Sequence, residues 1–464
     1  MSAQTQLIVA TAVFFLTYAV IVTEKIHRTI VAFLGAVIIV LLKVLSMEEA
    51  VRAIDWNTLG LLTGMMIIVG ITRRTGIFEY LAVLAAKRAG GKPVAIMVSL
   101  GIITAVVSAF LDNVTTVLLI VPVTLAVARQ LKVSPIPFLI TEIISSNIGG
   151  TATLIGDPPN IMIGTKAHLG FMDFVFNLTP VIVLIQVVTV ILLALIYRRE
   201  LLTSPECRKN IMKMDERAEL RDVPLLRKCS VVLGLTILGF VAHQYVHMES
   251  SVIALVGASL LLLLASHRDP EEALHAVEWP VIFFFLGLFV VVGALEKVGV
   301  IEAVARFTVE VTKGQLIPAA ILILWVSAIL SAFVDNIPFV ATMIPLIQDM
   351  GRLGLAGGDP NLLWWALSLG ACLGGNGTVI GASANVVVCG IAEKMGFPIT
   401  FAGYMKVAFP LMLVSIVVSM IYLLFWAAEH GVVYMAATLA VGMGLYYSWK
   451  IFWREKEETA NNPQ

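Results

Sequence analysis

Eleven apolar stretches, each of spanning or near-spanning length, constrain this chain more than any other feature. Backbone amide and carbonyl groups inside a bilayer must bond to one another, so each stretch has to be helical. Apolar residues make up 59% of the sequence and charged residues only 13%, which excludes an ordinary soluble domain. The sequence therefore predicts an all-α membrane protein with eleven crossings. They lie near residues 6–23, 29–46, 57–72, 136–165, 178–197, 229–247, 251–266, 280–296, 362–393, 408–428 and 432–449.

Two further segments, 93–130 and 316–350, are each long enough for two helical arms. The first contains SAFLDNVTTVLLIVP (108–122) and the second SAFVDNIPFVATMIP (331–345), so an Asp-Asn pair lies near the middle of both. We interpret each segment as a re-entrant hairpin, which enters and leaves the bilayer on one side and carries its Asp-Asn pair at the tip.

The second half of the chain repeats the first at a displacement of 223 residues, as the two Asp-Asn motifs show. After two extra residues, GGTATLIGDPPN (149–160) is matched by GGNGTVIGASAN (374–385). Each repeat has five crossings and a hairpin, and this odd number predicts that the second copy is inverted. The predicted organisation is a first repeat (1–197), a cytoplasmic linker (198–228), a second repeat (229–428), and an extra helix with a cytoplasmic tail (429–464).

The distribution of Lys and Arg predicts the orientation in the membrane. The polar linker is rich in both, whereas the short loops HMES (247–250) and EHG (429–431) have neither. We therefore expect the N-terminus outside a plasma membrane and the linker and C-terminus in the cytoplasm.

A carboxylate in hydrocarbon is costly unless it is paired, neutralised or in contact with water, so Asp112 and Asp335 require an explanation. One is structural, because Asp and Asn are favoured N-caps and each pair precedes a predicted helix. The other is a shared ion site, because hairpins entering from opposite faces would bring their tips together. The two explanations are compatible. The candidate ligands at the tips are Asp112, Asn113, Thr115, Thr116, Asp335 and Asn336.

The motifs at 149–160 and 374–385 predict that two spanning helices, 136–165 and 362–393, are interrupted. Pro158 and Pro159 lack amide protons, and glycines disfavour helix interiors. Interrupted backbone at membrane depth lines a cavity or is buried in protein, so a structural kink is the alternative to a binding role. Freed carbonyls and side-chain oxygens suit a bare cation or a small oxyanion. The candidates here are Thr151, Thr153, Asp157, Asn160, Asn376, Thr378, Ser383 and Asn385.

Asp157 is an acid that only one repeat possesses, since Ala382 occupies the matching position. It is a natural place to load and release H⁺ or Na⁺, although it could also cap the helix that resumes at Pro158. Glu142 is a second unmatched acid and a candidate for proton coupling, ranked below Asp157. No Lys or Arg lies within either pair of motifs, which favours a cation, a proton, a neutral hydroxide or a monovalent anion over a dianion.

The motif stretches resemble those of the ion transporter superfamily that includes ArsB arsenite pumps, NhaD sodium/proton antiporters and, more distantly, divalent anion:sodium symporters. They are SAFLDNVTTVLLIVPVT with NIGGTATLIGDPPN, and VDNIPFVATMIP with GACLGGNGTVIGASANVV. Within the superfamily the chain is most similar to bacterial relatives of the melanosomal P protein. The resemblance implies two hairpin tips and two broken helices around the substrate, elevator-like alternating access and a homodimer. The carboxylate transporters of the superfamily carry Ser-Asn-Thr at each tip, where this chain has Asp112-Asn113-Val114 and Asp335-Asn336-Ile337.

We therefore expect a secondary ion transporter, most simply an antiporter of Na⁺ or another small cation against H⁺. The alternatives are transport of arsenite, antimonite or another small anion and, ranked lower, a passive anion channel. No hydrolase motif or nucleotide-binding loop is visible, so no enzymatic activity and no cofactor are expected. A formal net charge of zero argues against a nucleic-acid partner, and the four cysteines have no metal-ligand or disulfide spacing. The expected partners are a small inorganic ion, the lipid bilayer and a second copy of the chain.

Overall fold

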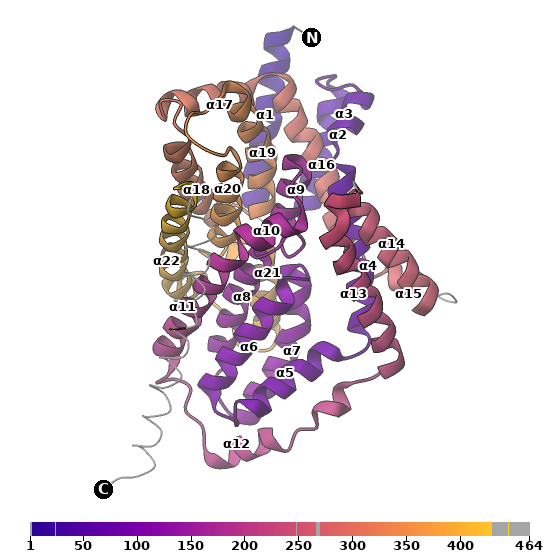
Figure 1. Ribbon diagram of the computed structural model, residues 1–464, viewed down its shortest axis with the longest axis vertical. Coiled ribbons are helices and arrows are strands. Elements are labelled where there is room, and N and C mark those ends of the chain that lie inside the picture. The colour runs from indigo at the N-terminus through magenta and orange to yellow at the C-terminus, as the bar shows by residue number, and fades with distance from the viewer. Residues whose placement is uncertain (1, 24, 247, 266–269, 429–443, 445–464) are drawn as a thin grey trace. The chain divides into compact units, whose positions relative to one another are not determined.

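The computed structural model describes residues 2–23, 25–246, 248–265, 270–428 and 444 (Figure 1). Their regular structure is helical, apart from one isolated bridge between Gln315 and Ala356. By length and composition seven of the described helices can cross a membrane, or up to eight if the bent pair α3 (Met47–Ala53) and α4 (Trp56–Arg73) forms one span. The prediction of an all-α, multi-pass membrane protein is thus confirmed. The seven are α1 (Ala3–Val22), α7 (Asn113–Leu131), α11 (Thr179–Tyr197), α13 (Val223–Val246), α16 (Trp279–Lys297), α18 (Leu316–Phe333) and α22 (Phe401–Ala427).

The count of eleven crossings and the inverted repeats stay predictions. Four shorter apolar helices lie between the seven longer ones. They are α2 (Arg28–Leu41), α6 (Pro93–Ser108), α14 (Ser250–Ala265) and α20 (Asn361–Gly374). The predicted extra helix at 432–449 and the tail after it lie outside the described residues.

The chain divides into two compact units, and each contains three separate segments. The described residues of the first unit fall within 1–77, 158–172 and 220–371, and those of the second within 78–157, 173–219 and 372–464. Besides helices already named, the first unit contains α9 (Pro158–Ala167), α15 (Pro270–Leu274), α17 (Val300–Val311) and α19 (Asn336–Leu353).

Small residues let helices of the first unit approach closely. A Cβ added at Gly64 of α4 would lie 2.7 Å from the backbone carbon of Ala254 in α14. One added at Gly287 of α16 would lie 2.5 Å from the backbone carbon of Ala32 in α2. Such contacts favour helix association in lipid, where burial of apolar surface contributes little.

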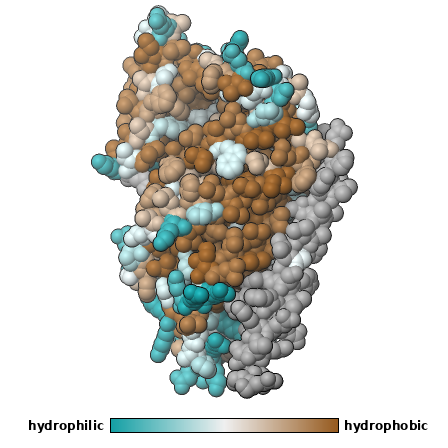
Figure 2. Space-filling model, turned by 90° about the vertical axis from the view of Figure 1, so that its left-hand side faces the viewer, coloured by the Kyte–Doolittle hydropathy of each residue, from teal (hydrophilic) through white to brown (hydrophobic). Residues whose placement is uncertain are grey.

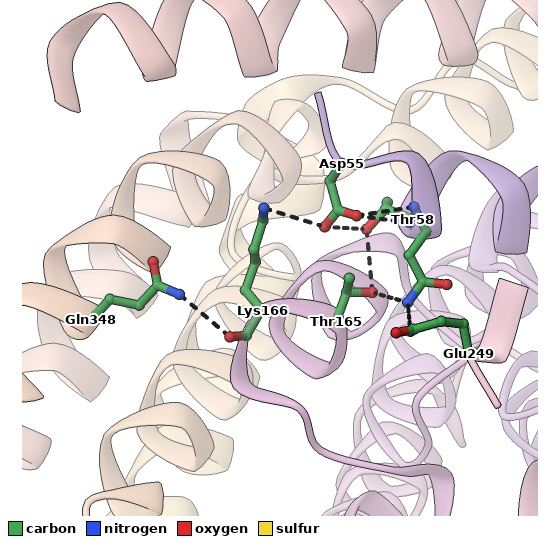
Figure 3. A network of polar contacts seen from close by, with 7 residues as sticks. Asp55, Thr58, Thr165, Lys166, Glu249 and Gln348 are labelled. Carbon is green, nitrogen blue, oxygen red and sulfur yellow. Dashed lines mark hydrogen bonds and ion pairs between the residues drawn. The ribbon is translucent and has the colours of Figure 1, made fainter. Parts of the chain in front are cut away.

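A network of polar side chains fixes α9 within the first unit (Figure 3). Asp55 caps α4 and accepts a hydrogen bond of 3.1 Å from the hydroxyl of Thr58. The Lys166 ammonium, near the end of α9, lies 3.9 Å from the same carboxylate. Gln348 of α19 donates to the Lys166 carbonyl at 3.3 Å. The end of α9 is thereby connected to both α4 and α19.

The second unit is built around α8 (Ile136–Thr151), in which residues 137–151 are all buried. Helices α6, α7, α11 and α21 pack against it. Gly149 is necessary for the contact with α6, because an added Cβ would lie 2.1 Å from the Ala105 carbonyl oxygen. The remaining elements of the unit are α5 (Ile77–Arg88), α10 (Phe171–Asn177), α12 (Pro205–Met212), η1 (Glu216–Glu219), η2 (Val379–Gly381) and α21 (Ser383–Lys394). The first residue of α5 and the first two residues of α10 belong to the first unit.

Helical structure stops at both motifs where the sequence predicts an interruption. Helix α8 ends at Thr151 and α9 begins at Pro158, and α20 ends at Gly374 before α21 begins at Ser383. Each Asp-Asn pair lies where one helix ends and the next begins, between α6 and α7 and between α18 and α19. The re-entrant path of these helix pairs stays a prediction.

Large apolar side chains remain exposed on the longer helices, as expected for surfaces in contact with lipid. Phe333 on α18 is 43% exposed and Ile421 on α22 is 45% exposed. Figure 2 shows one face of the molecule on which apolar residues form a broad area.

Candidate functional site

The first candidate ligand, Asp112, lies at the start of α7. Asp112 is the N-cap, and its carboxylate accepts a 2.9 Å hydrogen bond from the Thr115 amide. The predicted capping role of Asp112 is therefore present in the structure. Capping fixes Asn113 as the first helical residue, and its side chain is buried.

Four buried asparagines of the second unit form one hydrogen-bonded group, the asparagine cluster: Asn113, Asn147, Asn376 and Asn385. The Asn113 amide donates to the side-chain oxygen of Asn147 at 3.0 Å. The Asn147 amide donates in turn to the side-chain oxygens of Asn376 and Asn385, both at 2.9 Å. Buried amides must find partners, and here they largely find one another.

Asp157 adds a carboxylate to the asparagine cluster. It is fully buried, and its oxygen accepts from the Asn113 amide at 3.5 Å. The cluster therefore combines amide oxygens, amide N–H groups and one acid. The oxygen atoms of this group are hard ligands, which suit hard cations.

Both interruptions are compact because glycines meet across them. A Cβ added at Gly150 would lie 2.7 Å from the carbonyl oxygen of Gly156, and one at Gly375 would lie 3.0 Å from that of Gly381. These two pairs occupy matching positions in the repeat motifs. All four glycines belong to the second unit. In each motif, therefore, the first glycine of the pair lies against the carbonyl oxygen of the second.

Asn385 also satisfies the freed backbone of the second interruption. Its side-chain amide donates to the carbonyls of Gly375 at 2.8 Å and of Thr378 at 2.9 Å. Ser383 is the first residue of α21, and its side chain is partly exposed. The asparagine cluster is thus continuous with the interrupted backbone.

The threonine candidates of the second unit occupy different surroundings. The Thr151 hydroxyl donates to the Asn147 carbonyl at 2.7 Å, and that of Thr153 donates to the Ala109 carbonyl. Thr116 is fully buried, and its hydroxyl has no hydrogen-bond partner among the described residues. Its position, three residues after Asn113, places it on the same face of α7.

The remaining candidates, Asp335, Asn336 and Asn160, lie in the first unit. The Ser368 hydroxyl donates to the Asn160 side chain at 2.6 Å. Asn336 is buried at the start of α19, after the N-cap Asp335. These residues and the asparagine cluster belong to different units, so a site shared by the two tips stays a prediction.

One expectation about charge requires correction. The motifs contain no Lys or Arg, yet Arg28 of α2 forms a 2.6 Å ion pair with Asp335. The guanidinium also lies 5.0 Å from the centre of the Phe284 ring. Arg28 is 307 residues from Asp335 in the chain, so no local pattern could reveal the contact.

Sequence reasoning also missed Asn147, although it contacts more members of the asparagine cluster than any other residue. An available signal was an Asn within an apolar helix, two residues before the Gly149-Gly150 pair. Its matching position holds Cys372, so Asn147 is not a polar residue that both repeats share.

Glu142 is also fully buried in α8. The Thr124 hydroxyl of α7 is hydrogen-bonded to one of its carboxyl oxygens. The other oxygen has no hydrogen-bond partner among the described residues. Glu142 is therefore inside the second unit, not at its surface.

Comparison with known proteins identifies the family. A family model described as the citrate transporter, CitMHS, matches residues 18–370. The chain belongs to this family. It is a secondary transporter of the ion transporter superfamily, and the family is one of transporters rather than enzymes.

Relatives along nearly the whole chain agree with this assignment. An uncharacterized transporter of Mycobacterium tuberculosis, Rv2684, is 44% identical over 422 residues, which cover 90% of this chain and 97% of that protein. The 46 kDa membrane protein of Mycobacterium leprae is 42% identical over 420 residues, covering 90% of this chain and 98% of its own.

The human P protein is 38% identical over an alignment of 504 residues. That alignment covers 91% of this chain and 60% of the P protein. The predicted likeness to the P protein is confirmed. The crystal structure of the YdaH transporter of Alcanivorax borkumensis matches with a TM-score of 0.55 at 16% identity, over 82% of this chain and 87% of that one, which supports the fold alone.

Proposed function

We propose that this transporter exchanges a small cation, with Na⁺ as the favoured ion, for H⁺, and that the cation binds at the asparagine cluster. The observation that carries the proposal is the buried group of four amides with Asp157. Side-chain oxygens would replace the water around the ion, and the Asp157 carboxylate would balance its charge. Interrupted helices supply further carbonyls, as in other transporters whose sites lie at broken helices.

Binding would exchange one set of contacts for another. In the present arrangement the oxygens of Asn147, Asn376 and Asn385 accept hydrogen bonds from neighbouring amides. A cation would take these oxygens as ligands and turn the N–H groups outward. The amides satisfy one another in the absence of an ion, so the ion-free cluster does not leave these asparagine oxygens unpaired.

The full transport cycle includes features that we also propose. Hairpin tips at Asp112 and Asp335 would enter from opposite faces, and a mobile part of each protomer would carry the ion in an elevator-like movement. The N-terminus would lie outside, the linker and C-terminus in the cytoplasm, and two copies would form a homodimer. Proton coupling would involve one of the two buried acids that only the first repeat possesses, Asp157 or Glu142.

A second candidate substrate is a neutral hydroxide or small anion such as arsenite or antimonite. The amides of Asn113 and Asn147 are hydrogen-bond donors within the cluster, and donors can bind an oxyanion or a hydroxyl group. A passive anion channel ranks lower, because matched interruptions around one buried cluster suit an occluded site more than an open pore.

Flux into proteoliposomes tests this proposal. The screen would apply Na⁺, Li⁺, Cl⁻, arsenite and carboxylates, each with and without an imposed pH gradient. We expect saturable Na⁺ movement that responds to the gradient. Arsenite or chloride flux without cation flux would favour the second candidate, and an ohmic current in a planar bilayer would favour a channel.

The variant Asn147→Ala tests whether the transported ion binds at the asparagine cluster. It removes the amide that bonds to three other asparagines, at a cost of about 1–3 kcal/mol per unpaired partner. Transport should fall at least about tenfold, since 1.4 kcal/mol corresponds to a factor of ten. The matched control is Asn210→Ala in α12, where the side chain is exposed. Equal flux from both variants would exclude the cluster as the binding site.

A further inference from the structure

Glu142 differs from every other candidate acid in its surroundings. It lies in the middle of α8, fully buried, and one carboxyl oxygen has no hydrogen-bond partner in the described part of the chain. Its only described hydrogen bond joins it to the Thr124 hydroxyl of α7. A hydroxyl can either donate to a carboxylate or accept from a carboxylic acid, so Thr124 is compatible with both forms.

The helices that pack against α8 bring no cation into an ion pair with Glu142 among the described residues. Helix α6 has no titratable side chain at all, and Arg129 of α7 is exposed. An ionised carboxylate buried without a cation costs several kcal/mol, whereas the neutral acid does not. The other titratable groups on these helices are Tyr197 of α11, Cys389, Glu393 and Lys394 of α21, and Tyr404, Lys406 and Tyr422 of α22; Asp112 caps α7.

Helices α7 and α8, which hold Thr124 and Glu142, also hold two of the four members of the asparagine cluster. Asn147 follows Glu142 by five residues on α8, about 7.5 Å along the helix axis. Asn113 and Thr124 are both on α7, eleven residues apart and therefore on nearly the same face. Along α7 these two residues are about 16.5 Å apart, so buried protein separates the two sites by roughly 7.5 to 16.5 Å. A cation in the cluster and a charge on Glu142 would interact over this distance in the protein interior, and their coupling must be reciprocal.

We infer that Glu142 and Thr124 form a proton-binding site distinct from the asparagine cluster, and that cation binding at the cluster releases this proton. The inference rests on the proposed function and assigns a separate role to each of its two acids. Asp157 contacts Asn113 inside the cluster and balances the charge of the cation. Glu142 exchanges the proton: its O–H bond breaks, the electron pair stays on the carboxylate oxygen, and the proton passes to water.

Infrared spectroscopy of the purified protein tests whether Glu142 holds a proton, without any assumption about the transported ion. A buried neutral carboxylic acid has a carbonyl band that an ionised carboxylate lacks. The Glu142→Gln variant keeps the shape of the side chain and should lose this band, while Asp157→Asn should retain it. A spectrum that is the same in wild type and Glu142→Gln would overturn the inference.

A measurement of proton release on cation addition tests whether cation binding at the cluster releases the proton of Glu142. Na⁺ is added to the protein in weak buffer with a pH indicator, and choline is the control cation. The wild type should release protons, and Glu142→Gln should release at least about tenfold fewer. Thr124→Val keeps the carboxyl group and should change the pH of half-maximal release without abolishing release. A shifted pH of half-maximal release in Thr124→Val would show that the site titrates, whereas a folding defect would abolish release altogether.

The outcomes separate this inference from the proposed function. If Na⁺ raises the thermal stability of both wild type and Glu142→Gln, and proton release is equal in the two, the inference is wrong and the cation site stands. If no cation among Na⁺, Li⁺ and K⁺ alters the stability of the wild type, the proposed function fails and the linkage to the cation fails with it. In that case the infrared band still decides whether Glu142 holds a proton.

Discussion

The two Asp-Asn pairs have the same residues in the chain and different partners in the fold. In the second unit Asp112 caps α7, and Asn113 bonds to Asn147 and Asp157. In the first unit Asp335 caps α19 with a 3.1 Å bond from the Ile337 amide, but it also forms an ion pair with Arg28. The local capping geometry is common to both, and the charge environment is not.

This difference indicates how two copies of one motif can take separate roles. The ion pair between Arg28 and Asp335 connects α2 to the start of α19. Asp112 and Glu142, in the second unit, form no ion pair among the described residues. The unit that contains the asparagine cluster and the unit that contains the Arg28–Asp335 ion pair therefore need not contribute equally to transport.

Loss of Asn113 should have the largest effect on transport. Asn113→Ala removes a buried amide that contacts both Asn147 and Asp157, so flux should fall about tenfold to a hundredfold. Asn336→Ala should also reduce flux if the two tips share a site. Flux through each purified, folded variant measures this. Normal transport by both variants would leave capping as the whole role of the tips.

The ion pair itself should contribute mainly to stability. Arg28→Ala leaves the Asp335 carboxylate, whose side chain is 11% exposed, without its cation. Removal of one partner from a buried pair costs about 3–5 kcal/mol, and partial exposure lowers our expectation to about 1–3 kcal/mol. Denaturation in detergent measures this loss in the free energy of unfolding.

A double variant and a matched control sharpen the comparison between the tips. Arg28→Ala with Asp335→Asn should recover much of the lost stability, because no isolated charge remains. Asp112→Asn should change stability by less than about 0.5 kcal/mol, since Asn caps about as well as Asp. Equal losses from Asp112→Asn and Asp335→Asn would mean that the two tips do not differ as described.

The smallest effect concerns the ion pair between Lys87 and Glu216, which involves neither Asp-Asn pair. The Lys87 ammonium donates to Glu216 and lowers the pKa of that carboxyl below its usual range. A lowered pKa in the folded state stabilises the protein above the ordinary carboxyl range, and this contribution disappears as pH falls through the folded value. Melting temperature against pH should fall less steeply in the acid range for Glu216→Gln. The change should be small because the pair is partly exposed.

The sequence could predict those features that depend on neighbouring residues. Glycines and prolines at 149–160 specify an interrupted helix, and Asp112 before Asn113 specifies an N-cap. Arg28 and Asn147 could not be assigned in this way. Their partners lie hundreds or tens of residues away in the chain, and only the packing of helices brings them together.

The most direct test of cation binding at the asparagine cluster is radioactive Na⁺ uptake by Asp157→Asn in proteoliposomes, with and without a pH gradient. The variant keeps the size of the side chain and most of its hydrogen bonds, but it cannot balance a positive charge. Our account predicts that Na⁺ uptake is lost under both conditions, while Asn210→Ala transports as the wild type does. A variant that retains the full response to the pH gradient would contradict the account and remove Asp157 from the ion site.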